Sequence, residues 1–416
     1  MRVQSILNRI EKHKGFVYER VRWSDAQASV LQVEVRPRRG SQPQCSGCGQ
    51  RGPGYDTLAR RRFQFVPLWG MQVFFLYALR RVQCGRCGVK VEVVPWAQGK
   101  RSLTLSYMHF LATWAGRLSW QEVARFFCTS WEQVFRSVRW MVEWGLAHRD
   151  LSGIRALGLD EVAFQRGQRY LTVVYQIEAQ CKRLLWVGRE RTARSLEQFF
   201  AALGPPRSAQ LRFICSDLWK PYLQVVAQRA PRALHLVDRF HVALNLNKAV
   251  DQVRAQEAEE MRRQGMEPVL KHSRWCLLKR PQHLAGPQAV KLAELLRHNL
   301  KTVRAYLLKE DFEFFWDCLG PWGGRRFLTG WYHRALRSRL EPLKRVARML
   351  RAHRNLLLNW FRAPHQLCTG ATGGLNNRLK LTLRKAYGFR TFRAAELALY
   401  PTLGALPRPT CTRRFC

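Results

Sequence analysis

The sequence contains few acidic residues for its length. Its 416 residues include 29 Asp and Glu against 71 Lys and Arg, which gives a net charge of +42 and a pI near 11.0. An excess of this size makes a free chain repel itself unless a polyanion neutralises it. Nucleic acid is the first candidate, because basic side chains that contact phosphates release counterions. The charge balance therefore predicts a protein that binds nucleic acid.

Long apolar runs are also missing. The longest uninterrupted apolar stretch is Val73–Leu79, far short of the roughly 18 residues that indicate a membrane-spanning helix. The first residues, MRVQSILNRIEKHKGF, contain no apolar segment of the kind found in secretory signals. These absences argue against an anionic membrane as the partner. They predict a cytoplasmic, nucleoid-associated bacterial protein with several domains.

The 12 Cys residues do not form the regular pattern of a disulfide framework. Four of them form two pairs, Cys45-Ser-Gly-Cys48 and Cys84-Gly-Arg-Cys87, and the other eight are scattered singly. Glycines beside each pair let the backbone turn toward a metal ion. Four thiolates suit a closed structural zinc site, although two unrelated pairs, one of them a redox dithiol, are the alternative. We predict a zinc ribbon at 41–97, after an N-terminal segment at 1–40.

Residues 98–150 have the pattern of a helical domain. Ser119 and Glu122 have the spacing of a capping box, and Thr129 or Ser130 can cap a second helix after a short turn. This arrangement resembles a helix-turn-helix whose second helix enters the major groove of DNA. An ordinary helical hairpin is the alternative. The second helix would turn three apolar side chains inward: Val134, Val138 and Met141.

Several residues of these two regions are predicted to contact DNA. Basic side chains of the ribbon would contact phosphates, and the start of the second helix would lie at the groove. The predicted contact residues are Arg60, Arg61, Arg62, Arg80, Arg81, Trp131 and Arg136.

A third region begins near residue 155. Three β-rich segments, RALGLDEVAF, RYLTVVYQIE and RLLWVGRE, precede a helix pattern, the strand LRFICSD, another helix and the short strand LHLVD. This order is typical of a ribonuclease-H-like α/β core, which makes the expected fold class multidomain α+β. The expected parts are 151–245 (core, first part), 246–355 (basic α-helical insertion), 356–400 (core completion) and 401–416 (tail).

Two aspartates stand at notable positions of this core. Asp160 lies within the first strand and Asp217 ends the fourth. A carboxylate among apolar strand residues is costly to bury unless it is paired or binds a metal ion. In this element order the two strands are neighbours, so we expect the side chains to converge, as two Mg²⁺ ions at a phosphodiester require. For either aspartate alone, a role in capping the next helix is the alternative.

Longer motifs make a family resemblance specific. They are the two Cys pairs, SWQEVARFF, LDEVAFQRGQRYLTVV, CSDLWKPY, LVDRFHVALNLNKAVDQVR and GGLNNRLKLTLRKAYGFRTF. With them the chain resembles the DDE transposases of the IS-L-three insertion-sequence family over nearly its whole length. The resemblance implies Mg²⁺-dependent cleavage of transposon-end DNA and joining of the freed 3′-hydroxyl to target DNA. It also implies a dimer or higher assembly, with Asp160 and Asp217 as metal ligands.

The chain departs from the family pattern at one position. In the family, a third metal-binding carboxylate is a Glu that opens the final helix, in a pattern like Gly-x-x-Glu-Gly-x-Asn. Here the sequence is Gly370-Ala-Thr-Gly373-Gly374-Leu-Asn376, so Gly373 occupies the position of the Glu. We therefore expect impaired catalysis. The alternative is an inactive DNA-binding derivative, either a regulator or a decayed copy.

Other carboxylates are poorly placed to substitute for the missing Glu. Glu341 lies in a basic helix well before the position, and Glu396 lies about six helical turns after it. Glu161 adjoins Asp160, but adjacent strand residues face opposite sides of a sheet. Asp238 is nearer, but the resemblance makes its motif a structural or substrate-positioning element.

The insertion contains aromatic and basic side chains that could grip DNA strands. The alternative, that most of the aromatics form the insertion's own core while the arginines lie on its surface, is the stronger interpretation. The residues are Trp275, Phe314, Phe315, Trp316, Trp322, Trp331, Arg334, Arg337 and Arg339. An RNA-binding or ribosome-associated protein would also explain the charge and the zinc, but not the two aspartates.

Overall fold

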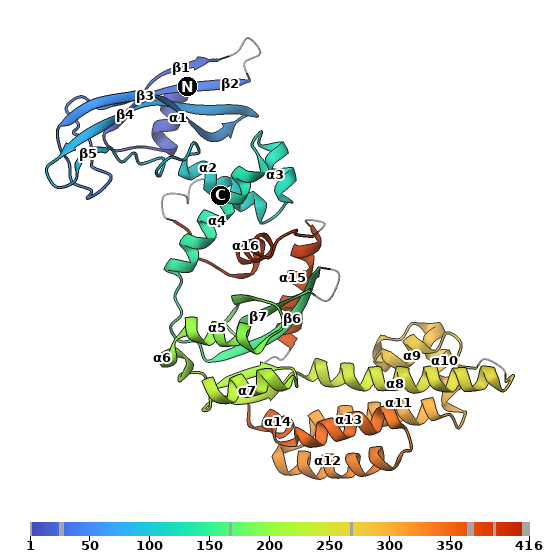
Figure 1. Ribbon diagram of the computed structural model, residues 1–416. Coiled ribbons are helices and arrows are strands. Elements are labelled where there is room, and N and C mark those ends of the chain that lie inside the picture. The colour runs from blue at the N-terminus through green and yellow to red at the C-terminus, as the bar shows by residue number, and fades with distance from the viewer. Residues whose placement is uncertain are drawn as a thin grey trace. The chain divides into compact units, whose positions relative to one another are not determined.

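The computed structural model describes residues 2–24, 29–165, 169–266, 269–363, 370–385 and 388–409. The chain divides into two compact units. The first comprises Met1–Asp150 with Leu379–Cys416, and the second comprises Leu151–Arg378. Each unit contains one mixed sheet together with helices (Figure 1). None of the helices in the described ranges is both long and apolar enough to cross a bilayer.

The sheet of the first unit has the order β1-β2-β4-β3, with β5 paired to β4. Strands β2 and β4 are parallel, and the other pairs are antiparallel. The long β3–β4 hairpin turns at Trp69 and Gly70, which both have positive φ, as a tight two-residue hairpin requires. The elements are α1 (Val3–Ile10), β1 (Phe16–Trp23), β2 (Val30–Pro37), β3 (Gly54–Leu68), β4 (Met71–Cys84) and β5 (Gly88–Val91). The expected boundary at residue 40 therefore falls inside one sheet.

The helices of the first unit follow the expected pattern. They are α2 (Leu105–Ala115), α3 (Trp120–Phe126), α4 (Trp131–His148) and α16 (Phe392–Leu403). Ser119 and Glu122 form the predicted capping box, and Ser130 caps α4 by accepting from Gln133 N. The turn contains no glycine, and Cys128 takes its positive φ. The three apolar residues predicted to face inward are buried: Val134, Val138 and Met141.

The sheet of the second unit has the order β10-β9-β6-β7-β8. Strands β6, β7 and β8 form an antiparallel meander, and β9 and β10 continue the sheet parallel to β6. The elements are β6 (Ala156–Gln165), β7 (Arg169–Glu178), β8 (Cys181–Arg189), α5 (Ala193–Leu203), α6 (Pro205–Ser208), β9 (Phe213–Ser216), α7 (Lys220–Arg229) and β10 (Leu234–Val237). This is the predicted order with one addition, the short helix α6.

The two faces of this sheet are covered differently. Leu157 and Leu159 of β6 pack into an apolar cluster with α5 and α7. The opposite face meets the start of α15 (Gly370–Lys385), where a Cβ on Gly158 would lie 2.4 Å from Cγ2 of Thr372. Glycine at 158 therefore permits α15 to approach β6 closely.

A set of helices follows β10 and has its own core. Its main helices are α8 (Arg239–Arg263), α9 (Arg274–Leu278), α10 (Gly286–Leu296), α11 (Lys301–Glu313), α12 (Gly320–Arg337), α13 (Glu341–Ala352) and α14 (Arg354–Leu358). Helix α8 contacts α11 and α13 along its length (Figure 1). Of the six aromatics considered above, Phe315, Trp316 and Trp331 are buried in this core. Trp275, Phe314 and Trp322 are exposed, as are the three arginines.

The C-terminal part differs from the expected single helical segment between Gly374 and Leu399. Two helices, α15 and α16, occupy this region. Gly388 has a φ of +96°, which interrupts helical geometry. Thr391 then caps α16 by accepting from Ala394 N at 3.2 Å.

Candidate functional site

The four predicted cysteines come together in the first unit. The Sγ atoms of Cys45, Cys48, Cys84 and Cys87 all lie within 4.8 Å of one another, and those of Cys48 and Cys84 are 3.5 Å apart. Thiolates around a tetrahedral zinc ion at 2.3 Å would be about 3.8 Å apart. Backbone N–H groups of Arg86 and Cys87 lower the pKa of Cys84, whereas contact with the Cys48 thiol and burial raise the pKa of Cys87. The donor set therefore fits a structural zinc ion.

The second unit brings three aspartates to one edge of its sheet. Strands β6 and β9 pair Gly158 with Cys215, and β9 and β10 pair Ser216 with Val237. Extending these pairings by one or two residues along the strands places Asp160, Asp217 and Asp238 side by side at the same level of the sheet. Asp217 and Asp238 directly follow the carboxyl ends of β9 and β10, and Asp160 lies at the same level in the middle of the longer strand β6. The predicted neighbourhood of the strands of Asp160 and Asp217 is thus observed, and Asp238 joins them.

Asp160 is grouped with Asp238 and with His241 from the first turn of α8. The His241 Nε2 atom lies 3.4 Å from Oδ1 of Asp160 and 4.0 Å from Oδ2 of Asp238. The two aspartates are 9% and 5% exposed. One ligand atom from each of the three residues lies within 4.8 Å of the others. Two carboxylate oxygens and an imidazole nitrogen are a donor set that could hold a divalent cation.

Asp217 belongs to a neighbouring set of charges. Its Oδ2 accepts from Nη2 of Arg191 at 2.8 Å, while Nε of Arg191 lies 2.9 Å from Oε1 of Glu161. Its Oδ1 accepts from the backbone N–H of Trp219 at 3.0 Å. Asp217 is therefore not part of the group around Asp160. To share a cation with Asp160, Asp217 would have to release Arg191.

The electrostatics of this edge reflect crowded carboxylates. Burial raises the pKa of Glu161 to about 7, with a further rise caused by Asp217 and a smaller opposing effect of Arg191. Burial also raises the pKa of Asp238. For His241, burial lowers the pKa, but the hydrogen bond and charge of Asp160 outweigh it, so that the net pKa is raised. A bound cation would stabilise the ionised carboxylates here.

Helix α15 supports Asp160 directly. The side-chain amide of Asn376 donates to Oδ2 of Asp160, and Oδ1 of Asn376 accepts from Tyr175 Oη at 2.7 Å. Thr372, one turn earlier, donates to Oδ2 of Asp238 at 3.4 Å. Asn376 was not singled out from the sequence, nor was His241. Both stand within quoted motifs, but their contacts with Asp160 depend on the tertiary fold.

Gly373 lies between Thr372 and Asn376, the two residues of α15 that contact this group. With about 100° per residue, it is about 60° around the helix axis from Asn376, whereas Gly374 is about 160° away. Gly373 is exposed, and a Cβ built there would meet no heavy atom within 4 Å. A longer side chain at 373 would therefore fit without displacing its neighbours. The other two carboxylates considered pair elsewhere: Glu341 with Arg348, and Glu396 with Arg393.

The residues predicted to contact DNA differ in how they are engaged. Arg80 is held in an ion pair with buried Glu92, with Nε at 2.9 Å and Nη2 at 2.8 Å from Oε2, and its Nη1 donates to Ser41 O. A phosphate contact by Arg80 would have to break this pair. Trp131 is 48% exposed. The remaining pairings are Arg60 with Glu34, Arg81 with Asp56 and Arg136 with Glu132, while Arg61 and Arg62 lie over the rings of Phe63 and Phe74.

Comparisons with known proteins agree on one family. A family model described as "Transposase" matches residues 157–399. The transposase for insertion sequence element IS1001 of Bordetella parapertussis is 28% identical over 380 residues, which cover 91% of this chain and 92% of that protein. The transposase for insertion sequence element IS1557 of Mycobacterium tuberculosis is 29% identical over 408 residues, which cover 92% of this chain and 90% of that protein. The family match includes Asp160, Asp217 and Gly373.

The contacts of Asn376 predict a large effect of its removal. Asn376→Ala removes one hydrogen bond to a buried carboxylate and one to a buried hydroxyl, so we expect the free energy of unfolding to fall by about 2–4 kcal/mol. Asn377→Ala is the matched control, because Asn377 is exposed and should change stability by less than about 0.5 kcal/mol. Urea unfolding measures both. Equal stability of the two variants would contradict the described docking of α15.

Proposed function

The chain belongs to the IS-L-three family of DDE transposases, and on that premise we propose that it binds transposon ends and carries a Mg²⁺-dependent site for DNA strand cleavage and strand transfer. The observation that carries this proposal is the alignment of Asp160, Asp217 and Asp238 at one level of three adjacent parallel strands, where β9 and β10 end. The element order, with a helical insertion before the closing helix α15, supports a ribonuclease-H-like core. Site and fold thus point to the same chemistry.

The residues of the site have distinct roles in this proposal. Asp160 and Asp217 hold the catalytic ions, with Asp238 and His241 as further donors beside Asp160. Such ions activate a water nucleophile and stabilise the leaving oxygen of a phosphodiester. Asn376 and Tyr175 fix the orientation of Asp160. The ion pair with Arg191 positions Asp217, and a cation shared with Asp160 would replace that pair.

This copy is proposed to be impaired because no carboxylate stands at position 373. Loss of a ligand should cost more than the roughly 10- to 100-fold that loss of a supporting residue costs. A catalytically inactive DNA-binding derivative, acting as a regulator or persisting as a decayed copy, is the second candidate function. Position 373 favours this second candidate. A Glu would fit there without steric conflict, so the fold does not require a glycine at the cost of a metal ligand.

The first unit would supply the DNA contacts. Its structural zinc ion would hold the two cysteine knuckles together, and α4 would approach the major groove. Arg62 and Trp131 are exposed there, and the net charge of +42 favours a polyanionic partner. The proposed substrate is double-stranded DNA, both transposon ends and target, bound by a homodimer or higher assembly.

Restoring the missing carboxylate tests the assignment of position 373. We expect Gly373→Glu to raise Mg²⁺-dependent cleavage of a transposon-end duplex by at least about 100-fold over the unmodified chain. Gly374→Glu is the matched control, because it adds the same charge on the far side of the helix and should give no increase. Strand cleavage is measured on labelled DNA with Mg²⁺ or Mn²⁺. Equal rates for the unmodified chain and Gly373→Glu would contradict the proposal, as would equal gains for both variants.

The cysteine cluster predicts one tightly bound zinc ion per chain. Cys48→Ser should lose the ion, because three thiolates no longer close the tetrahedral site, and the melting temperature should fall. Cys128→Ser replaces an exposed cysteine outside the cluster and should retain one zinc per chain. Elemental analysis of the purified proteins measures the metal. Absence of zinc from the unmodified protein would contradict the proposed zinc ribbon.

A further inference from the structure

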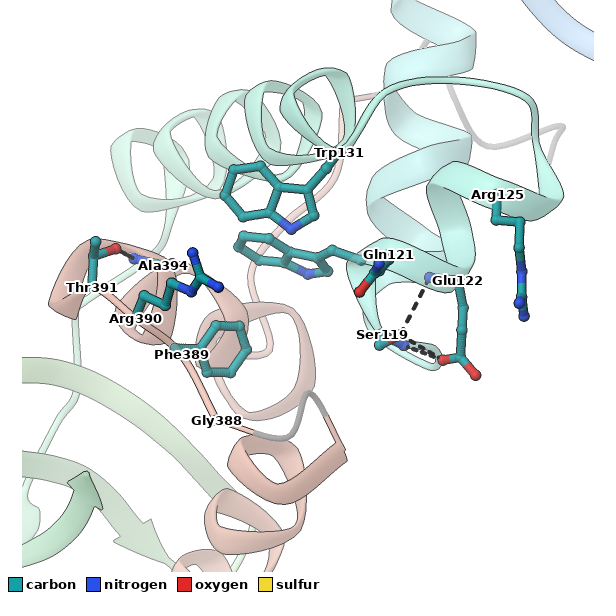
Figure 2. Close-up of a pocket in the computed structure, with 11 residues that line it drawn as sticks. Ser119, Gln121, Glu122, Arg125, Trp131, Gly388, Phe389, Arg390, Thr391 and Ala394 are labelled. Carbon is teal, nitrogen blue, oxygen red and sulfur yellow. Dashed lines mark hydrogen bonds between the residues drawn. The ribbon is translucent and has the colours of Figure 1, made fainter. Parts of the chain in front are cut away.

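The first unit contains a cavity that the proposed function does not use. Its volume is about 830 Å³, and it lies between α3, α4 and the segment 388–391 that precedes α16. Figure 2 shows the side chains of Trp131, Phe389 and Arg390 meeting at this cavity from two distant parts of the sequence. All of its walls belong to one compact unit.

Aromatic rings form the main wall of the cavity. The ring centroids of Trp120 and Trp131 are 5.8 Å apart, and those of Trp120 and Phe389 are 5.6 Å apart. Phe135 stacks behind Trp131, with ring centroids 5.4 Å apart and an interplanar angle of 13°. Trp120 is 4% exposed, whereas Trp131 is 48% exposed. Trp131 is therefore a supported, rigid platform with part of its ring open to a ligand.

The polar part of the lining indicates the charge of the ligand. Arg125 and Arg390 both line the cavity. The single carboxylate of the lining, that of Glu122, accepts from the backbone N–H and hydroxyl of Ser119 at 2.9 and 2.7 Å (Figure 2). This carboxylate is therefore committed to the capping box. Cations beside aromatic rings suit a ligand that combines a flat ring with an anion.

A nucleotide has this combination, because its base can stack on an aromatic ring while its phosphate pairs with an arginine. An apolar peptide has no anionic group to place beside the arginine side chains that line the cavity. A base inside a duplex has both faces covered by its neighbours, so it could not stack on Trp131. The lining therefore favours an unpaired nucleotide.

We propose that this cavity captures an unpaired nucleotide of the bound DNA, with its base stacked on Trp131 and its phosphate beside Arg390. The inference rests on the proposed function, because α3 and α4 are the elements proposed to contact duplex DNA. It adds a second mode of recognition to them. The chain would bind a duplex with an unpaired tail more tightly than a blunt duplex.

Fluorescence anisotropy with the full chain tests this inference. The probes are a blunt duplex, the same duplex with a tail of a few unpaired thymidines, and the same tail made of abasic nucleotides. The thymidine tail should tighten binding by about 5- to 100-fold, the range that one base–aromatic stack provides. The abasic tail keeps the phosphates without the bases, so it should give little of this gain.

Substitutions then test whether the preference for the thymidine tail depends on the cavity. Trp131→Ala and Phe389→Ala should lose the preference for the thymidine tail, and Trp131→Phe should keep most of it. Phe126→Ala is the matched control, because Phe126 is an aromatic of α3 that is 59% exposed and does not line the cavity. Melting temperatures confirm that each variant folds.

The outcomes separate this inference from the proposed function. Duplex binding without any gain from the thymidine tail overturns the inference alone. So does an abasic tail that binds as tightly as the thymidine tail, or an equal loss in Phe126→Ala. A uridine RNA tail bound more tightly than the thymidine tail overturns the assignment to DNA. Failure to bind any duplex, together with no cleavage by Gly373→Glu, contradicts the proposed function itself.

Discussion

The contact between Asn376 and Asp160 is the constraint on which the second unit depends. It joins the first strand of the sheet to a helix that begins more than two hundred residues later in the chain. The hydroxyl of Tyr175 donates a hydrogen bond to the oxygen of the same amide. Gly158 leaves the space that the helix needs to approach the sheet. With α15 docked in this way, position 373 lies about 60° around the helix axis from Asn376.

The site is arranged around negative charge that the protein compensates only in part. Arg191 pairs with Asp217 and Glu161, while His241 lies beside Asp160 and Asp238. Burial raises the pKa of Glu161 and of Asp238, in accordance with this crowding. Such an arrangement is stabilised by a cation, and it gives a physical meaning to the family motif that contains Asp238 and His241. In a copy without a carboxylate at 373, these two residues are the donors closest to Asp160.

Local features of the fold could be predicted from the sequence, and long-range ones could not. The capping box at Ser119 and Glu122 follows from spacing alone, and the two Cys pairs indicate their own cluster. The order of strands and helices along the second unit could be predicted from the succession of β-rich and helical segments. The pairing of β2 with β4 could not be predicted, because parallel pairing depends on a crossover between distant segments. The hydrogen-bond and ion-pair partners of Asp160 and Asp217 could not be predicted either, because Asn376 and Arg191 are distant from them in the sequence.

The central claim is that a carboxylate at position 373 would complete a metal site in which Asp160, Asp238 and His241 already lie together. Titration calorimetry with Mn²⁺ on the zinc-loaded chain tests this claim most directly, because it measures the affinity for the metal ion without requiring catalysis. The account predicts weak binding by the unmodified chain, loss of that binding in Asp160→Asn, and binding at least about 10-fold tighter in Gly373→Glu. Identical affinities for the unmodified chain and Gly373→Glu would contradict the account.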